Sequence, residues 1–344
     1  MHGRCGLRVE FLAMSSSPNE TPTSDLPRRP IIIALVLSIL LTLAVLVGTK
    51  LLFGDGRDPV ALSELPSEQA DSAECSALID ALPQSLNGLE KARLVDPAPA
   101  GAFAWSGRDN QRITLRCGVQ APAQYTTMAR TEDINGRQWL RVKDATTGST
   151  MQTWYLVGAT PTVAVTADAE SLKDAANPVE GLGDALSPID GEALAPAAAP
   201  LSQLDSPAAD AASCQTYQQA LPTVLETSSG SYRQIKGSEV EAAGYPRKPD
   251  NTVVWMPDDD GLEPIITRCG VAEPAGYEPG QQLQQVNDIP WFNDTTLANG
   301  TTQGVWYALG RDVAIAVAMP QAVGQTVFVE VGNVIAETTE TVAR

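Results

Sequence analysis

Histidine is almost absent from this sequence. The 344 residues contain one, His2, which precedes the long apolar run near the N-terminus. A Ser-His-Asp or Cys-His arrangement therefore cannot form in the part of the chain after that run. A phosphate-binding P-loop and a glycine-rich dinucleotide fingerprint are also missing. These absences predict a protein that is not an enzyme, with no catalytic residues and no cofactor.

Basic residues are also scarce. Lys and Arg number 23 against 41 Asp and Glu, and the net charge is −18. Such a chain repels phosphate backbones, so we expect no nucleic-acid partner. It repels anionic lipid headgroups as well. Solubility in a salty compartment is the simplest interpretation of the acidity.

Long apolar segments are limited to Ile31–Gly48, which carries no charge. As a helix this run spans about 27 Å, close to the thickness of a bilayer core. Arg28 and Arg29 precede it, which predicts an N-terminus that stays in the cytoplasm. No small-x-small cleavage site follows. We therefore expect an uncleaved signal anchor, a single pass through the cytoplasmic membrane and extracytoplasmic C-terminal domains.

Only five cysteines occur, and Cys5 lies before the apolar run. The other four are Cys75, Cys117, Cys214 and Cys269, and none forms a C-x-x-C pair. Zinc sites usually need such pairs, so no metal is expected. Two cysteines at matching places in each half predict one disulfide per half, Cys75 with Cys117 and Cys214 with Cys269. Disulfides in turn predict an oxidising compartment.

What the sequence does contain is an internal repeat. Ile113–Val119 (ITLRCGV) recurs as Ile265–Val271 (IITRCGV), at an offset of 152 residues. The offset holds over 54 residue pairs, of which 17 are identical; unrelated sequences would share about 3 or 4. Upstream, Cys75 and Cys214 open matching segments at an offset of 139. The chain is therefore a tandem duplication.

The repeat and the composition together predict the domain organisation. We expect a cytoplasmic tail without a fold (1–29), a transmembrane signal anchor (30–53), a tether (54–66), a first ectodomain repeat (67–189), an Ala/Pro-rich linker (190–205) and a second ectodomain repeat (206–344).

Each repeat is predicted to be α+β, a small and mostly antiparallel sheet with packed helices. Apolar spacing after Cys75 indicates a helix that reaches toward Leu86 and is ended or kinked by Pro83. The segments 169–186 and 326–338 are predicted to be helical, and Ser228–Asp250 to be a loop. Strands are predicted at 103–105, 112–117, 138–142, 153–157 and 162–166. Glycines that follow strand residues indicate turns with positive φ at Gly118, Gly158, Gly270 and Gly310.

The candidate binding residues come from this repeat. All six tryptophans pair between the copies, which most simply indicates core packing. Trp154-Tyr155 and Trp306-Tyr307 lie on predicted strands, so in each pair one ring is expected in the core and the other nearer the surface, as a platform for a sugar ring or an apolar peptide. Arg116 and Arg268 face away from the cysteines; each is expected to pair with an acid or, as a site, to hold a carboxylate or phosphate.

Two kinds of acidic site are weighed against these residues. The turn Pro257–Gly261 holds three aspartates, but it lacks the spacing of a calcium loop, and a solvated hairpin turn explains it better. A catalytic carboxylate pair is formally possible. No Asp or Glu is identical between the copies over the 54 pairs, which disfavours that role.

The motifs resemble a family of actinobacterial envelope proteins known only as domain of unknown function 3515. The shared residues are Cys75, Leu82, Pro83, Trp105, Leu115, Arg116, Cys117, Gly118, Val119, Pro122, Trp154 and Tyr155. The second copy repeats most of them, with Thr267 in place of Leu115. The resemblance implies an envelope location and no specific activity; the duplication departs from the single domain typical of the family.

Three hypotheses follow. The leading one is a non-enzymatic, membrane-anchored protein that binds or scaffolds an envelope protein or a cell-wall component, with Ile31–Gly48 in the membrane. The second is a carboxylate-dependent hydrolase or transferase that acts on envelope polymers. The third is an accessory subunit of a membrane complex, in which the anchor helix itself does the work.

Overall fold

The structure is a computed structural model, and it describes residues 28–53, 59–146, 148–246, 251–297 and 302–342. Contacts divide the chain into two compact units, Met1–Gly56 and Arg57–Arg344. Most of the predicted tail lies outside the described residues, as does the start of the predicted tether. Each unit is described by itself.

The first unit holds one helix, α1 (Arg28–Phe53). Its segment Pro30–Gly48 has a mean hydropathy of 3.1, and no residue of its apolar window is buried by the protein. The Thr42 hydroxyl donates to the Ser38 carbonyl at 2.8 Å, so that polar side chain is satisfied within the helix. The helix is long and apolar enough to cross a membrane, as a signal sequence or an anchor would be.

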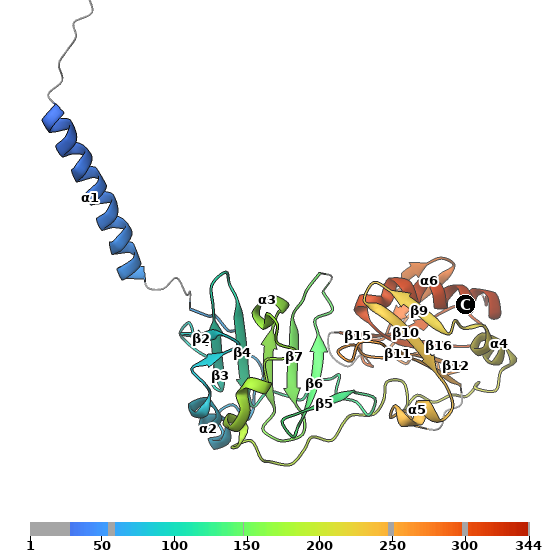
Figure 1. The fold of residues 1–344 in the computed structure, drawn as a ribbon. Coiled ribbons are helices and arrows are strands. Elements are labelled where there is room, and N and C mark those ends of the chain that lie inside the picture. The colour runs from blue at the N-terminus through green and yellow to red at the C-terminus, as the bar shows by residue number, and fades with distance from the viewer. Residues whose placement is uncertain (1–27, 54–58, 147, 247–250, 298–301, 343–344) are drawn as a thin grey trace, which may run out of the picture. The chain divides into compact units, whose positions relative to one another are not determined.

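The second unit contains two sheets of eight antiparallel strands (Figure 1). The first sheet has the order β1-β2-β3-β4-β8-β7-β6-β5. Its strands are β1 (Ser85–Leu86), β2 (Leu89–Lys91), β3 (Ala102–Ser106), β4 (Arg112–Cys117), β5 (Thr131–Ile134), β6 (Arg137–Lys143), β7 (Gln152–Leu156) and β8 (Val163–Ala167).

The second sheet repeats this topology strand for strand. Its order, β13-β14-β15-β16-β12-β11-β10-β9, is the same path read from the other edge. The strands are β9 (Val224–Thr227), β10 (Gly230–Ile235), β11 (Thr252–Pro257), β12 (Ile265–Cys269), β13 (Gln284–Val286), β14 (Ile289–Asn293), β15 (Gln303–Ala308) and β16 (Ile315–Pro320). The predicted duplication is therefore a duplication of the fold.

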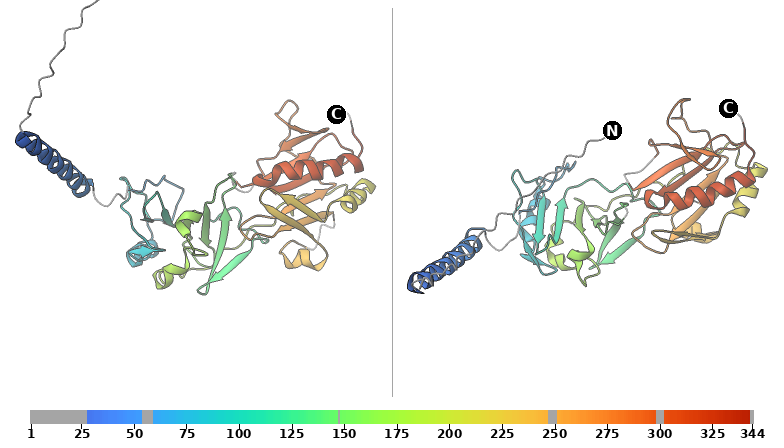
Figure 2. Two further views of the ribbon diagram at one scale, coloured as in Figure 1. Left: turned by 45° about the horizontal axis from the view of Figure 1, so that its top comes forward. Right: turned by 90° about the horizontal axis from the view of Figure 1, so that it is seen from above.

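Each sheet has an inner face, which carries the disulfide, and an outer face. On β4, alternation sends Ile113, Leu115 and Cys117 to the inner face, where all three are buried, and Thr114 and Arg116 to the outer face. Helices close the inner faces, and α6 lies along the second sheet (Figure 2). They are α2 (Ala73–Ala81), α3 (Ala169–Leu172) and η1 (Glu180–Leu186) in the first domain, and α4 (Ala212–Ala220), η2 (Gln321–Val323) and α6 (Gly324–Thr338) in the second.

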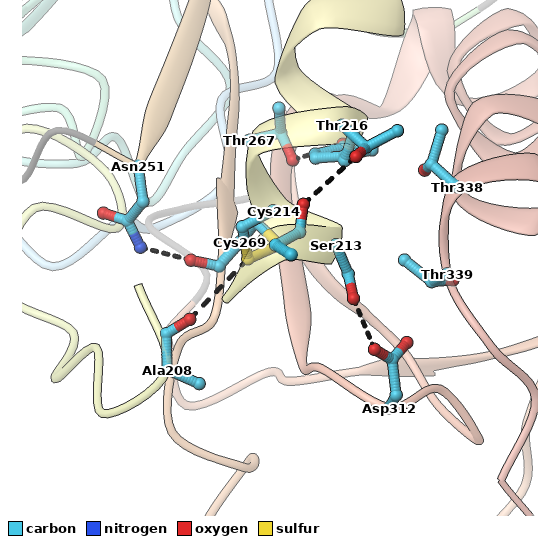
Figure 3. Close-up of a disulfide and its surroundings, with 12 residues drawn as sticks. Ala208, Ser213, Cys214, Thr216, Asn251, Thr267, Cys269, Asp312, Thr338 and Thr339 are labelled. Carbon is cyan, nitrogen blue, oxygen red and sulfur yellow. Dashed lines mark hydrogen bonds between the residues drawn. A yellow bond between two sulfur atoms is a disulfide. The ribbon is translucent and has the colours of Figure 1, made fainter. Parts of the chain in front are cut away.

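Both predicted disulfides are confirmed. Cys75 on α2 is joined to Cys117 on β4, and Cys214 on α4 is joined to Cys269 on β12, with Cα–Cα distances of 5.5 and 5.4 Å. Around the second one, Asn251 donates to the Cys269 carbonyl (Figure 3). Each bridge fastens a helix to a central strand of its sheet, so it stabilises the contact between the two layers.

A tryptophan explains why Ala-Leu-Pro recurs beside each cysteine helix. The Trp105 indole N–H donates to the Pro83 carbonyl at 2.8 Å, and Trp255 donates to Pro222 at 2.8 Å. Both tryptophans are fully buried. A buried indole N–H needs an acceptor, and the carbonyl at the end of the helix supplies it.

Most predicted elements of the first domain are confirmed within a residue at each end, including all five strands and the antiparallel pairing. The helix that begins near Cys75 ends earlier than its apolar spacing suggests. Leu82 precedes a proline and takes an extended conformation, so Leu86 lies on β1 instead.

Two other predictions are wrong in part. The segment 169–186 is not one helix: Pro178 has no N–H to donate and Lys173 has φ of 54°, so α3 and η1 are separate. The predicted loop 228–250 contains β10 and α5 (Ser238–Ala242). Positive φ is confirmed at Gly118, Gly270 and Gly310 but not at Gly158.

Candidate functional site

The two outer faces differ in polarity along one row of paired residues. In the first sheet, Thr114 pairs with Thr166, and Thr166 pairs with Thr153; the latter two hydroxyls are 2.8 Å apart. At the matching positions the second sheet has aliphatic side chains. They are Ile266, Ala318 and Val305. The same face is thus hydroxyl-rich in one domain and apolar in the other.

A neighbouring row keeps the same residue types in both domains. In the first sheet Arg116 pairs with Ala164, and Ala164 pairs with Tyr155. In the second, Arg268 pairs with Ala316, and Ala316 pairs with Tyr307. The predicted candidates Arg116 and Tyr155 therefore share one face with an alanine between them, which leaves space above the sheet.

In the first domain this face is an open groove. Its floor is formed by Thr114, Arg116, Thr153, Tyr155 and Thr166. The residues 119–124 form one wall and Leu65 and Pro66 another, and Thr302 of the second domain reaches the same groove. Its lining also includes Lys143, Asp144 and Met151. The mixture of hydroxyl, amide and apolar groups suits a polar chain molecule.

The groove has an ionised side chain of each sign. Hydrogen bonds from Ser149 and Thr146 hold the pKa of Asp144 below its usual range against the effect of burial, so its carboxyl is ionised at neutral pH. Burial lowers the pKa of the Arg116 guanidinium, which nevertheless stays protonated. Asp144 is the one carboxylate among the described lining residues. Paired-carboxylate chemistry would need a second.

Contrary to the simplest expectation, neither arginine forms a salt bridge within the part of the chain that the structure describes, although Asp205 lies near enough to Arg268 to act on its charge. Arg116 donates from Nη2 to the Ser63 carbonyl at 2.5 Å. Arg268 donates from Nη1 to the carbonyls of Leu201 and Leu204, the latter at 2.9 Å. Each arginine thus binds the backbone of the segment that enters its domain. Fewer N–H groups of the guanidinium therefore remain for a carboxylate or phosphate ligand.

Polypeptide covers the outer face of the second domain. Leu201 and Tyr245 are buried there against Val254, Ile266 and other outer-face residues. Burial raises the pKa of Tyr245 and lifts that of Tyr307 to about 12. Arg268 is 1% exposed beneath this cover. Where the first domain has a groove, the second has a closed hydrophobic cluster.

Part of this cover comes from residues that the first domain lacks. Lys91 pairs with Trp105 in the first sheet, and Gln234 pairs with Trp255 in the second, so Lys91 and Gln234 are equivalent residues. The sequence offset is 143 between Lys91 and Gln234 and 150 between the two tryptophans, so the second domain has additional residues between these positions. The added residues lie in the segment that carries α5 and Tyr245. The second domain therefore supplies part of the cover of its own outer face, and Met128 of the first domain is buried in the same cluster.

The aromatic pairs behave as expected in one domain and differently in the other. Trp154 is buried on the inner face and Tyr155 is half-buried on the outer face, so one ring is in the core and one is nearer the surface. In the second domain Tyr307 is buried under the cover, and Trp306 is half-exposed on the inner-face side. The structure brings Arg116 and Tyr155 into one groove, while Trp154, Arg268 and Tyr307 are inaccessible.

Polar contacts join the two domains beside the groove. Asp259 accepts hydrogen bonds from Lys143 and from Arg141, the latter at 3.3 Å, and Asp260 accepts one from Arg130 at 2.6 Å. The predicted solvated turn therefore faces cations of the first domain. Burial opposes ionisation of Asp259, but the Lys143 hydrogen bond, the Gly261 amide and the nearby cations outweigh it and lower its pKa.

Sequence reasoning missed the segment that each arginine binds. Leu62-Ser63-Glu64-Leu65 corresponds to Leu201-Ser202-Gln203-Leu204 at the same offset of 139 residues that relates the cysteines. Extending that offset upstream would have found the motif. The predicted tether and the predicted linker thus both end in one repeated structural segment.

Fold and groove define a tandem α+β protein with an N-terminal apolar helix and one disulfide in each domain. The chain belongs to the family described as protein of unknown function DUF3515, whose model matches it twice, over residues 35–194 and 189–343. No curated protein and no solved structure matches it. The predicted resemblance and the tandem arrangement are thereby confirmed.

Proposed function

We propose that this chain is a non-enzymatic, membrane-anchored protein of the cell envelope, and that its first domain binds a polypeptide partner in the outer-face groove. One observation carries the proposal: the same sheet face is open in the first domain and covered by polypeptide in the second. The covered copy supports a polypeptide as the molecule that the open copy binds.

The chemistry of the groove indicates the character of the partner segment. In the second domain, leucine and tyrosine side chains cover aliphatic floor residues. In the first, the corresponding floor has three threonines and a half-buried tyrosine. The Tyr155 hydroxyl makes no hydrogen bond to any residue that the structure describes, and burial is what raises its pKa. A partner segment with polar side chains would satisfy these groups, and such an interface can form and dissociate without exposing a large apolar surface.

The second domain supports the groove rather than offering a second one. Thr302 lines the groove and accepts a hydrogen bond from the side chain of Gln124, which belongs to the wall formed by residues 119–124. Asp259 accepts a hydrogen bond from Lys143, another lining residue. The duplication thus provides one binding domain and one stabilising domain, which is a simpler role than bivalent binding.

The proposed location follows from the helix and the disulfides. Pro30–Gly48 would anchor the chain in the cytoplasmic membrane, with Arg28 and Arg29 on the cytoplasmic side. The two disulfides favour an oxidising compartment for both domains. The groove would then face other envelope components.

The test is site-specific photo-crosslinking of the full chain in its native cells. A photoreactive amino acid replaces Thr153 on the groove floor, and in a second strain it replaces Val224, an exposed residue of β9 in the second domain. We expect one defined envelope protein to be crosslinked from position 153 and not from position 224. Thr153→Arg should abolish that partner's recovery when the full chain is captured, and Val224→Arg should not.

Three outcomes would overturn the proposal. Equal crosslinking from both positions would show that the groove is not the site. Crosslinking to glycan or lipid alone would exclude a polypeptide partner. Turnover of a cell-wall fragment by the purified chain, lost in Thr153→Arg, would favour the enzymatic alternative.

A further inference from the structure

A second groove lies in the second domain, on the inner face of its sheet, where the sheet meets α6. Strands β13, β14 and β15 contribute to it, together with η2 and the first turns of α6. Its floor contains two aromatic rings, Trp306 and Phe328, whose centroids are 4.9 Å apart at an interplanar angle of 89°. This groove is separate from the one assigned above to a polypeptide.

Trp306 is the one tryptophan with an accessible ring. The other five are at most 1% exposed, including its counterpart Trp154. A glycine makes the difference: a Cβ on Gly304 would lie 2.6 Å from the Trp306 indole nitrogen, so the ring can lie against this backbone only because the side chain is absent. The first domain has Gln152 at the equivalent position. The local sequence therefore places an indole on the groove floor.

The rim of this groove is made of uncharged amides. Gln284, Asn293, Gln321 and Gln325 all line it and are exposed. Their side-chain amides make no hydrogen bonds within the part of the chain that the structure describes. Each amide offers both a donor and an acceptor. No charged side chain is among the described lining residues.

We infer that this groove binds a neutral oligosaccharide. The apolar C–H faces of a sugar ring pack against aromatic rings, and its hydroxyls need neighbours that both donate and accept hydrogen bonds, as carboxamides do. An anionic polymer would find no cation here and would be repelled by a chain of net charge −18. A lipid or an apolar helix would leave four amides without partners.

Binding can be followed by fluorescence, because the other five tryptophans are buried and Trp306 alone can meet a ligand directly. The full chain is purified in a detergent without a sugar headgroup and titrated with chitotetraose, maltoheptaose and cellotetraose, each to about 10 mM, which reaches affinities weaker than 1 mM. We expect one of these sugars to change the emission and to protect the chain from acrylamide quenching.

Variants at the rim assign the effect to this groove. Asn293→Ala combined with Gln325→Ala should weaken binding at least about tenfold, equivalent to about 1.4 kcal/mol. The control is Gln219→Ala, which removes an exposed glutamine from α4 outside the groove and should leave binding unchanged. Circular dichroism establishes that the variants are folded. Failure of all three sugars to bind, or equal binding by the rim variant, would overturn the inference.

The polypeptide groove has no part in this test. Thr153→Arg should leave sugar binding intact, since Thr153 lies in the first domain. Loss of sugar binding in that variant would place the sugar in the other groove and would also overturn the inference.

Discussion

Arg116 and Arg268 occupy the same position in the two sheets, and each donates to backbone carbonyls of the segment that leads into its domain. The arginine before the cysteine is therefore a structural clamp in both copies. The two clamps differ in burial: Arg268 is 1% exposed under a hydrophobic cover, while Arg116 is half-buried on the floor of an open groove.

This difference predicts unequal costs of substitution. Arg268→Ala removes hydrogen bonds to the Leu201 and Leu204 carbonyls and leaves these groups without a buried donor. We expect a loss of about 3 kcal/mol in the free energy of unfolding, and about 1 kcal/mol for Arg116→Ala, whose partner carbonyl can bond to water. Urea denaturation of the full chain in detergent, monitored by far-UV circular dichroism, measures both.

A matched pair of lysine variants separates geometry from charge. Lysine keeps the charge but cannot donate in two directions from one planar group. Arg268→Lys should therefore be destabilised almost as much as Arg268→Ala, and Arg116→Lys should be close to the parent. Equal costs for the two alanine variants would contradict the difference between a buried and a half-buried clamp.

The disulfides give a second prediction. They close segments with sequence separations of 42 and 55 residues, for which chain entropy predicts about 4 kcal/mol each. Cys75→Ala with Cys117→Ala, and separately Cys214→Ala with Cys269→Ala, should each lose stability of that order. Reduction of the parent protein should reproduce the combined effect in thermal denaturation. A single-pair variant as stable as the parent would show that helix packing alone holds the two layers together.

How far the sequence predicts this fold is clear from particular residues. The alternation along Arg112–Cys117 and the repeated cysteines determine the central strands and the disulfides, because each depends on a local period or on an exact repeat. The strands β1, β2 and β5 escaped prediction because each is short and contains a single apolar residue, which carries no periodicity.

The candidate site was predictable only in part. Strand alternation correctly placed Arg116 on the face away from the disulfide, and it correctly predicted that Trp154 and Tyr155 would lie on opposite faces without showing which of them is in the core. No local pattern could show that Leu201 and Tyr245 cover the equivalent face of the second domain, since both approach it from distant segments. The accessible residue Trp306 depends on Gly304 two positions away, and glycine in a strand has several explanations.

The contact between the domains gives a third prediction. Asp259 lies within hydrogen-bond distance of Lys143 and Arg141, and these side chains are 22 to 32% exposed. Asp259→Asn should therefore cost only about 1 kcal/mol, and the difference from the parent should shrink at high salt. Denaturation at two salt concentrations tests this. Asp258→Asn is the control, because Asp258 contacts Arg233 of its own domain and is more exposed. A cost that is independent of salt would argue against an electrostatic contact.

The last prediction concerns how the stability of the fold depends on pH through the carboxyl of Glu263. Burial raises the pKa of Glu263, and the hydrogen bond donated by Thr302 only partly opposes this shift. An acid whose pKa is higher in the folded state favours folding while it is protonated, and this contribution is lost as pH rises from the unfolded value of about 4.3 through the folded pKa. At neutral pH, the ionised Glu263 therefore destabilises the fold.

Glu263→Gln should raise the melting temperature at pH 7, because the amide oxygen can still accept from Thr302 without a buried charge. The gain should disappear below about pH 4, where the parent carboxyl is protonated in both states.

Asp259, whose pKa is lowered, has the opposite effect on stability: it stabilises the fold at neutral pH, and its contribution is lost on acidification. Asp259→Asn should thus lower the melting temperature at pH 7, and this deficit should shrink as the pH falls. Thermal denaturation of both variants from about pH 2 to about pH 7 distinguishes the two carboxyls, because the contribution of Asp259 is lost only below its unfolded pKa of about 3.9. A gain for Glu263→Gln that did not depend on pH would show that burial of its charge is not the cause.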